Sequence, residues 1–332
     1  MPLYSATTRQ ARENLEGNKF GRWHRKDAVP EEADGKLAFQ RLRKPLFTPS
    51  ILPGFKMRRE DKLFAIGSCF ARGVEAALLG RKMEVLSAAP ELASFRPSAK
   101  GLTGLGCTNK YNTYSIYNEL RWALDPEARF PRDSIVDVGS GLYYDPHTNP
   151  DLPLADLNET LRRRSIIQLV SSRIAQCRVV IITLGLVEVW RDKIANTFIN
   201  TTPIPDALCS HADRYEFQIS DFGQNLTNLE QVHALLSQFG HPDFHVVVTV
   251  SPVPLMATFS TQDVVIANTY SKSMLRAVAQ EWAAAHENVH YFPSYEIVLN
   301  SERTVVWEED LRHVRGPVVH HIIGIFLEHY LE

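Results

Sequence analysis

The chain has 332 residues, of which 44% are hydrophobic and 22% charged, and its formal net charge is -2. A chain of this length buries about three quarters of the surface that its unfolded form exposes, so we expect a sizeable core in one large domain or two smaller ones. This composition excludes a fibrous or disordered protein, and the near-neutral charge argues against nucleic acid as a partner.

Membrane insertion and metal binding also find no support in the sequence. No apolar run approaches the roughly 20 residues of a membrane-spanning helix, and the N-terminal residues lack the apolar core of a secretory signal. We therefore expect a cytoplasmic protein without a membrane span. Its four cysteines form no C-x-x-C pair, which argues against a metal cluster or a disulfide framework. We expect neither a metal nor another cofactor.

Residues 1–60 differ in character from the rest of the chain. They are polar, rich in charged residues and interrupted by prolines, with little periodicity. The aromatic residues Phe20, Trp23 and Phe47 offer contacts to the main body. We therefore predict an extended arm or lid over residues 1–60 and a single domain over residues 61–332.

From residue 62 onward, short apolar runs alternate with longer amphipathic segments. This pattern is typical of βα units around a largely parallel sheet, and the nearly continuous apolar runs indicate strands covered on both faces. The predicted strands are KLFAIGS, RVVIITLG, FHVVVTVSP and NVHYFPSYEIV, and the predicted helices span residues 70–83, 115–125, 158–176, 225–239, 264–286 and 317–331. Residues 90–150 are expected to form long loops, and residues 186–215 a polar insertion with a hairpin from VEVWRD to TFINTT.

The first predicted strand ends at Gly67, Ser68 and Cys69, directly before a predicted helix. Ligands bind at the carboxyl ends of the strands in such sheets. A thiol or hydroxyl at this turn would lie near backbone N–H groups and the positive end of the helix, which lower a thiol pKa and stabilise an oxyanion. The structural alternative is a serine that caps the helix, followed by a buried cysteine.

A second motif, EEDLRHVRG at residues 308–316, precedes the last predicted helix. An aspartate three residues before a histidine can orient the imidazole, which then acts as a general base toward a nucleophile from another strand. Asp310 and His313 fit this arrangement. A surface pair without a catalytic role is the alternative for so short a motif.

A third motif is ITLGLVEVW, residues 182–190, where a predicted strand ends at Gly185 and Glu188 follows. A glycine there permits close backbone approach, and nearby polar groups could line an oxyanion or substrate site. The alternative is a turn into a hairpin with a solvated glutamate. Weaker polar candidates, which also suit turns, caps or helix positions, are Asn109, Asn112, Asp145, His147, Thr249, Ser251, Asn268, Tyr270, Ser271 and Lys272.

In this order, the motifs resemble those of the GSCFA family, named for the string that stands here at residues 67–71. The blocks YNTYSI, TLGLVEVW, TVSPVPL, ANTYSKSMLR, YFPSYEI and EDLRHV extend the resemblance over residues 63 to about 316. That family is grouped with the SGNH or GDSL-type esterases. The resemblance therefore implies a flavodoxin-like, three-layer α/β/α sandwich and an acyl-ester hydrolase or transferase, with Asp310 and His313 on the D-x-x-H positions. It also implies an acylated carbohydrate or small acyl ester as substrate.

The chain departs from the related esterases at two positions. Those enzymes carry G-D-S, and aligning their glycine with Gly67 places Cys69 at the nucleophile position, with Ser68 as the alternative if the turn differs by one residue. Val187 stands where the oxyanion asparagine of the related G-x-N-D block is expected. Asn112 could substitute for it; otherwise backbone N–H groups alone would form the oxyanion site.

The leading hypothesis is an acyl-ester hydrolase or O-acyltransferase with a covalent acyl-enzyme. Cys69 attacks, His313 takes and returns the proton, and Asp310 orients His313. The N–H of Cys69 with Gly185 or Asn112 stabilises the oxyanion.

Two other hypotheses remain open. A non-catalytic module that binds a glycan or an acyl carrier such as coenzyme A would agree with the missing oxyanion asparagine. A metal hydrolase using His147, His211 and His313 would need a ligand spacing that the sequence does not contain.

Overall fold

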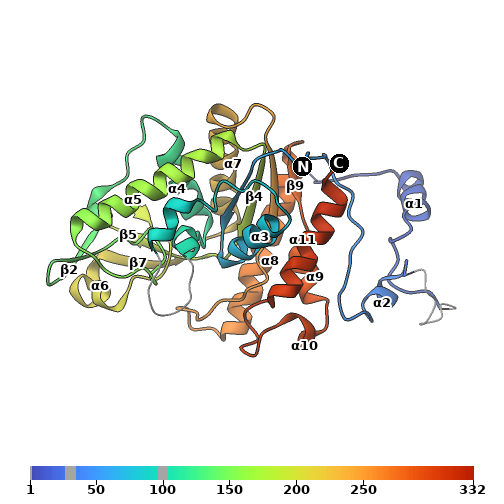
Figure 1. Cartoon of the computed structure of the whole chain (residues 1–332). Coiled ribbons are helices and arrows are strands. Elements are labelled where there is room, and N and C mark those ends of the chain that lie inside the picture. Colours follow the sequence, from blue (N-terminus) through green and yellow to red (C-terminus); the bar gives the residue numbers. More distant parts are fainter. Residues whose placement is uncertain (1, 27–34, 96–103) are drawn as a thin grey trace.

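The computed structural model describes residues 2–26, 35–95 and 104–332, and its centre is a four-stranded parallel sheet (Figure 1). Because all neighbouring strands run parallel, their carboxyl ends lie at the same edge, where ligands bind in sheets of this kind. In spatial order the strands are β1 (Leu63–Gly67), β4 (Val179–Leu184), β8 (His245–Val250) and β9 (Val289–Tyr291).

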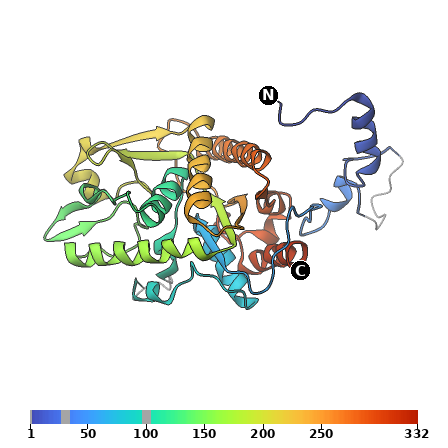
Figure 2. The same ribbon diagram turned by 90° about the horizontal axis from the view of Figure 1, so that it is seen from above.

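Helices cover both faces of this sheet, as Figure 2 shows. Side chains alternate between the faces of a strand, so Leu63 and Ala65 belong to one core cluster and Phe64 and Ile66 to the other. The first cluster includes side chains of α3 (Cys69–Gly80) and α11 (Gly316–Tyr330). The second includes side chains of α4 (Thr113–Leu124), α7 (Phe222–Phe239) and α8 (Val264–Ala285). The expected α/β class and three-layer sandwich are confirmed.

The predicted helices are present with small shifts at their ends, and α5 (Leu157–Ser172) continues into a 3-10 turn over Arg173–Gln176. The prediction for NVHYFPSYEIV was wrong in its second half. Strand β9 ends at Tyr291, and helix α9 (Ser294–Leu299) follows, with the short helix α10 (Arg303–Val306) after it. Pro293 lies at the boundary, where its missing N–H prevents continuation of a strand ladder.

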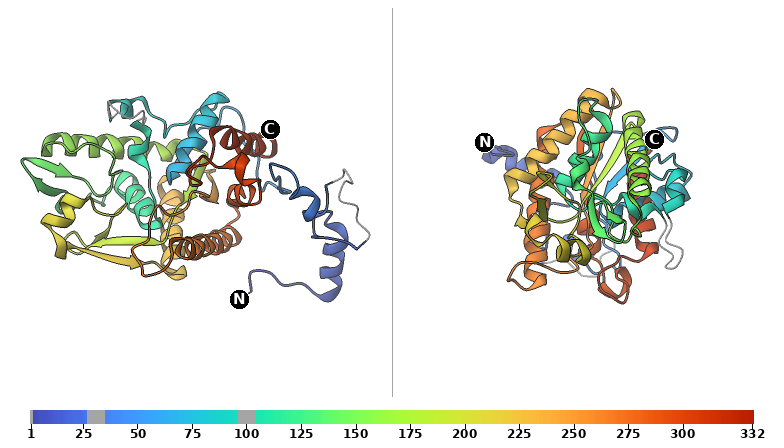
Figure 3. Two further views of the ribbon diagram at one scale, coloured as in Figure 1. Left: turned by 90° about the horizontal axis from the view of Figure 1, so that it is seen from below. Right: turned by 90° about the vertical axis from the view of Figure 1, so that its left-hand side faces the viewer.

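The polar insertion forms a separate antiparallel sheet at the end of the molecule opposite the N-terminal helices (Figure 3). The predicted hairpin is confirmed by the pairing of β5 (Glu188–Asp192) with β6 (Thr197–Phe198), and β7 (Tyr215–Ile219) joins the other edge of β5. The short helix α6 (Pro205–Ser210) lies between β6 and β7 in the sequence. Within the predicted loops of residues 90–150, a small hairpin pairs β2 (Val136–Gly139) with β3 (Leu142–Tyr144).

The N-terminal residues contain an unexpected helix, α1 (Thr8–Gly17), which has no buried residue and lies away from the sheet (Figure 1). A short helix, α2 (Ala38–Arg41), follows. The contact with the body comes later in the chain: the N–H of Phe47 donates to Ser301 Oγ at 2.8 Å. Phe47 is buried, whereas Phe20 and Trp23 are exposed. A role as arm or lid stays a prediction, and part of that segment, residues 27–34, lies outside the described residues.

The described residues include no helix that is both long and apolar enough to cross a membrane.

Candidate active site

The turn after β1 is built around Gly67. Its φ is 135°, and a Cβ placed on it would lie 2.2 Å from the carbonyl oxygen of Thr183 in β4. Only glycine tolerates both the conformation and this close approach. The N–H of Ser68 donates to the same Thr183 carbonyl at 3.1 Å, and α3 begins at Cys69. The predicted strand, turn and helix therefore meet at the carboxyl end of β1.

Ser68 and Cys69 have different environments in this turn. Ser68 is the N-cap of α3: its Oγ accepts from the N–H of Phe70 at 3.3 Å and lies 3.2 Å from Thr183 Oγ1. It is 3% exposed, so its hydroxyl serves the helix end and the neighbouring strand. Cys69 is a half-buried free thiol, whereas Cys209 is exposed. The structure thus assigns Ser68 the capping role and leaves Cys69 more accessible.

The charges around Cys69 are positive. Burial raises the pKa of the Cys69 thiol, while the charges of Arg312 and Lys272 and the backbone N–H groups of Cys69 and Phe70 act in the opposite direction. Each of these groups favours the thiolate, which is the nucleophilic form.

Asp310 and His313 form the expected pair on the loop before α11. His313 Nδ1 lies 2.5 Å from Asp310 Oδ2, and Asp310 Oδ1 accepts from the backbone N–H groups of Arg312 and His313, both at 2.9 Å. These hydrogen bonds hold the pKa of Asp310 well below its usual value. Because an ionised carboxylate only accepts, Nδ1 carries the proton and Nε2 of His313 is the acceptor atom.

Arg312 connects this pair with the Cys69 turn. Its Nη1 lies 3.1 Å from His313 Nε2, and its charge acts on the Cys69 thiol. Cys69 and His313 come from distant parts of the sequence, yet the same guanidinium bonds to one and acts through its charge on the other. The sequence indicated the two ends of this arrangement but not Arg312, although that residue lies inside the D-x-x-H motif.

The carboxyl end of β4 brings a further cation to this place. A Cβ on Gly185 would lie 2.4 Å from the carbonyl oxygen of Tyr111 and 3.4 Å from Ser68 Cβ, so Gly185 permits the 109–112 loop to cross the strand end. Lys272 of α8 donates from Nζ to the carbonyl oxygen of Gly185 at 2.6 Å. Burial lowers the pKa of Lys272 to about 7, while the charge of Cys69 acts in the opposite direction. The sequence marked Lys272 only as a weak candidate.

The comparison with protein families agrees with these motifs, because the GSCFA family matches residues 62–326. The chain belongs to the GSCFA family. Among solved structures, the family 3 carbohydrate esterase of Clostridium thermocellum is similar with 11% identity and a TM-score of 0.34, over 81% of this chain and 94% of that chain. This likeness is too weak to transfer an activity. No curated protein matches the chain.

Two residues that were expected to line the site of this GSCFA protein have structural partners instead. Asn112 is the N-cap of α4, and its Nδ2 donates to the carbonyl oxygens of Ile199 and Asn200 at 3.1 and 3.2 Å. Both of its amide hydrogens are therefore in use. Glu188 is 8% exposed and accepts from Thr258 Oγ1 at 2.5 Å. The solvated alternative for Glu188 was wrong, since the carboxylate anchors the loop at residues 258–259.

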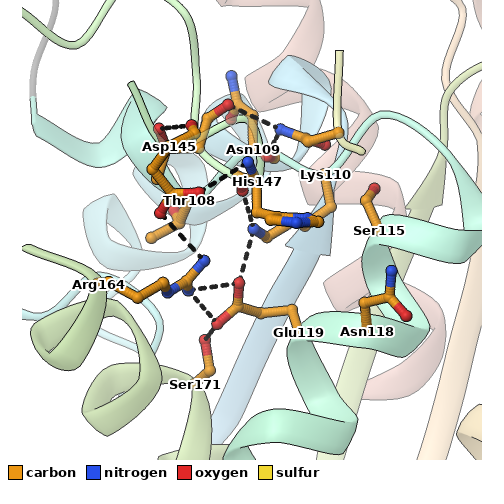
Figure 4. Close-up of polar contacts among 12 residues, drawn as sticks. Thr108, Asn109, Lys110, Ser115, Asn118, Glu119, Asp145, His147, Arg164 and Ser171 are labelled. Atoms are coloured by element: carbon orange, nitrogen blue, oxygen red, sulfur yellow. Dashed lines mark hydrogen bonds and ion pairs between the residues drawn. The ribbon is translucent and has the colours of Figure 1, made fainter. Parts of the chain in front are cut away.

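A buried ion network anchors the 109–112 loop of this GSCFA protein (Figure 4). Lys110 Nζ lies 2.7 Å from Glu119 Oε2, and Arg164 Nη2 lies 2.6 Å from both carboxylate oxygens of Glu119. Burial opposes ionisation of Glu119, but the charges of Arg164 and Lys110 prevail and lower its pKa to about 2. The backbone N–H of Lys110 donates to the carbonyl oxygen of Gly67 at 2.7 Å, which joins the network to the turn before Cys69.

The three histidines of the metal hypothesis have unrelated surroundings. His147 is buried with its ring against Trp122, whereas His211 Nε2 lies 3.1 Å from the carbonyl oxygen of Asp137. His313 pairs with Asp310. Across residues 2–26, 35–95 and 104–332, no group of three or more His, Cys, Asp or Glu side chains is arranged to hold a metal ion.

Proposed function

We propose that this GSCFA protein is an acyl-ester hydrolase or O-acyltransferase that forms an acyl-enzyme on Cys69. The observation that supports this most is the position of Arg312, whose charge acts on Cys69 and whose Nη1 lies 3.1 Å from Nε2 of His313. One guanidinium therefore acts electrostatically on the candidate nucleophile and bonds to the oriented candidate base. Membership of the family favours an acylated carbohydrate or a small acyl ester as substrate.

The proposed reaction begins when Cys69 Sγ bonds to the ester carbonyl carbon and the carbonyl π pair moves to oxygen. The thiol proton passes to Nε2 of His313, which Arg312 leaves to make room, and Asp310 stabilises the imidazolium. The C–O bond then breaks, and His313 returns the proton to the departing oxygen. In the second half of the reaction, water or an acceptor hydroxyl attacks the thioester carbonyl carbon and gives its proton to His313. The C–S bond then breaks, and His313 returns the proton to the sulfur of Cys69.

The oxyanion of the tetrahedral intermediate needs donors other than those of the related esterases. Val187 has no polar side chain, and the amide hydrogens of Asn112 are already bonded. We assign the role to the backbone N–H groups of Cys69 and Gly185. Cys69 is the first residue of α3, where N–H groups lack helical partners and the helix dipole favours negative charge.

The test is to quench the protein during reaction with p-nitrophenyl acetate and to locate acetyl groups by peptide-mapping mass spectrometry. Exposed Cys209 reports the background reaction of an ordinary thiol in the same sample. We expect an adduct on Cys69 that exceeds the one on Cys209, is lost in His313→Ala and persists in Ser68→Ala. An adduct on Ser68 would reject Cys69 as the nucleophile.

A binding module for a glycan or an acyl carrier is the second candidate, because the expected oxyanion side chain is absent at Val187 and the amide of Asn112 is engaged. This candidate predicts no ester consumption and no His313-dependent adduct. Calorimetric titration with acetylated oligosaccharides and with coenzyme A would then show binding without turnover.

A further inference from the structure

The charges of two cations, Lys272 and Arg312, act on the Cys69 thiol. Lys272 is 2% exposed, and among residues 2–26, 35–95 and 104–332 its Nζ has one hydrogen-bond partner, the carbonyl oxygen of Gly185. Arg312 bonds to His313, and its Nε is buried with no hydrogen-bond partner among the described residues. In the part of the chain that the structure describes, no carboxylate forms an ion pair with either cation.

The buried cations Lys110 and Arg164 differ from Lys272 in having a carboxylate as partner. Lys110 and Arg164 share the carboxylate of Glu119 at 2.6–2.7 Å. A buried charge without a counter-ion is strongly unfavourable, so the environment of Lys272 favours an anion nearby. Asp310 lies beside Arg312 but is bonded to His313, and the charge of Asp151 acts on Tyr111. The acidic groups that remain are the thiol of Cys69, which interacts with Lys272, and the phenol of Tyr111, which interacts with Cys69. Burial raises the pKa of Tyr111 to about 12, which leaves it neutral at ordinary pH.

We propose that the ammonium group of Lys272, held on the carbonyl of Gly185, is the counter-charge of the Cys69 thiolate, with Arg312 as a second cation. The carbonyl that holds Nζ belongs to the residue whose Cα faces Ser68, so the ammonium is fixed beside the turn that carries the nucleophile. Lys272 thereby acts through Cys69 as a positioning residue. The inference rests on the proposed function, because it takes Cys69 as the reactive group.

The electrostatic effects are reciprocal, as the pairing requires. Burial raises the pKa of Cys69 and lowers that of Lys272, and in both cases the charge of the other group acts against the effect of burial. The groups that interact with Cys69 come from three elements: Lys272 from α8, Arg312 from the loop before α11, and Tyr111 from the loop before α4. Only the first two carry positive charge, so their loss has a predictable sign: the thiol becomes harder to ionise.

The test measures the rate at which iodoacetamide alkylates Cys69 across pH 5 to 10, followed peptide by peptide in the mass spectrometer. In this reaction the C–S bond forms, the C–I bond breaks, iodide leaves and the thiol proton goes to the buffer. The variants are Lys272→Met and Lys272→Arg. Lys56→Met is the matched control, because Lys56 also donates from Nζ to a backbone carbonyl at 2.6 Å but is exposed.

We expect Lys272→Met to move the apparent pKa of Cys69 upward and to slow its alkylation about tenfold near neutral pH, which corresponds to one pKa unit. Lys272→Arg keeps the charge and should restore most of the rate. Lys56→Met should match the wild type, and Cys209 should alkylate alike in every protein. An unchanged Cys69 profile in folded Lys272→Met would overturn the proposal, as would equal slowing by arginine and methionine.

Folding of Lys272→Met is checked by circular dichroism and urea unfolding, and methionine in place of an unpaired buried ammonium should leave stability equal or higher. If Lys272→Met does not fold, the same pH dependence of alkylation is measured in Arg312→Met. An unshifted pKa of Cys69 in that variant would overturn the proposal. Ester chemistry is separate from this readout. If the alkylation of Cys69 depends on Lys272 but Cys69 is not acetylated by the ester, the proposed function is rejected and the ion pair between Lys272 and Cys69 is supported.

Discussion

The buried Glu119 network allows a sharp prediction about stability. Replacing Glu119 with Gln keeps the size of the side chain but removes the charge that neutralises Lys110 and Arg164. Their side chains are each 2% exposed, and that of Glu119 is 1% exposed. Removing one partner from a buried ion pair costs about 3–5 kcal/mol because it leaves an uncompensated charge in the interior. That is a large part of the roughly 5–15 kcal/mol that stabilises a typical domain.

The pKa of Glu119 leads to a similar magnitude by a separate route. It falls from the usual 4.5 to about 2, and a shift of this size corresponds to about 3 kcal/mol. Since the folded pKa is lowered, the ionised network stabilises the protein at pH values above 4.5 and loses this contribution as the pH falls toward 2. The difference between wild type and Glu119→Gln should therefore be largest near pH 7 and shrink on acidification.

The assay is urea unfolding at pH 7 and at pH 3, with Glu159→Gln as the matched control. Glu159 also binds two arginines, Arg162 and Arg163, and its hydrogen bond to Arg162 lowers its pKa to about 2 as well. Its side chain is 31% exposed, however, so solvent screens the charges, and exposed ion pairs contribute about 0–1 kcal/mol. We expect Glu119→Gln to lose about 3 kcal/mol at pH 7 and the control to lose less than about 1. Equal losses in the two variants would refute the reasoning.

Three further predictions follow from the site. Ser68→Ala should keep ester turnover while losing about 1 kcal/mol of stability, since a helix cap is removed; loss of turnover in a folded variant would contradict the capping role. Gly185→Ala should cost at least about 1–3 kcal/mol in urea unfolding, because the new Cβ would lie 2.4 Å from the carbonyl oxygen of Tyr111, whereas Gly316→Ala meets nothing within 4 Å and should be neutral. Asp310→Asn should lower kcat by at least about 100-fold, as expected when an imidazole loses its orienting carboxylate; a wild-type initial rate would remove Asp310 from the mechanism.

Much of the fold was readable from the sequence because its signals are local. Apolar runs identified the four central strands, and the turn at Gly67 followed from a strand that runs directly into a helix. Asp310 and His313 are three residues apart, so one loop is enough to join them. The misses are also local in origin: α1 is held by a capping box at Thr7 and Gln10 without any apolar face that packs on the body, and an apolar run similar to a strand continues as helix α9.

The composition of the site depended on contacts that no local pattern encodes. From the sequence, Asn112 is a plausible oxyanion donor, but in the structure its amide donates to the carbonyl oxygens of residues 199 and 200. A solvated Glu188 is equally consistent with the sequence, but in the structure the loop at residues 258–259 donates hydrogen bonds to its carboxylate. Lys272 lies 87 positions from Gly185 in sequence. Chain folding alone brings such groups together, and burial then gives their charges and hydrogen bonds a strength that they lack in water. The sequence therefore determined the strands and the motif residues, and the tertiary structure decided which polar groups remain available for chemistry.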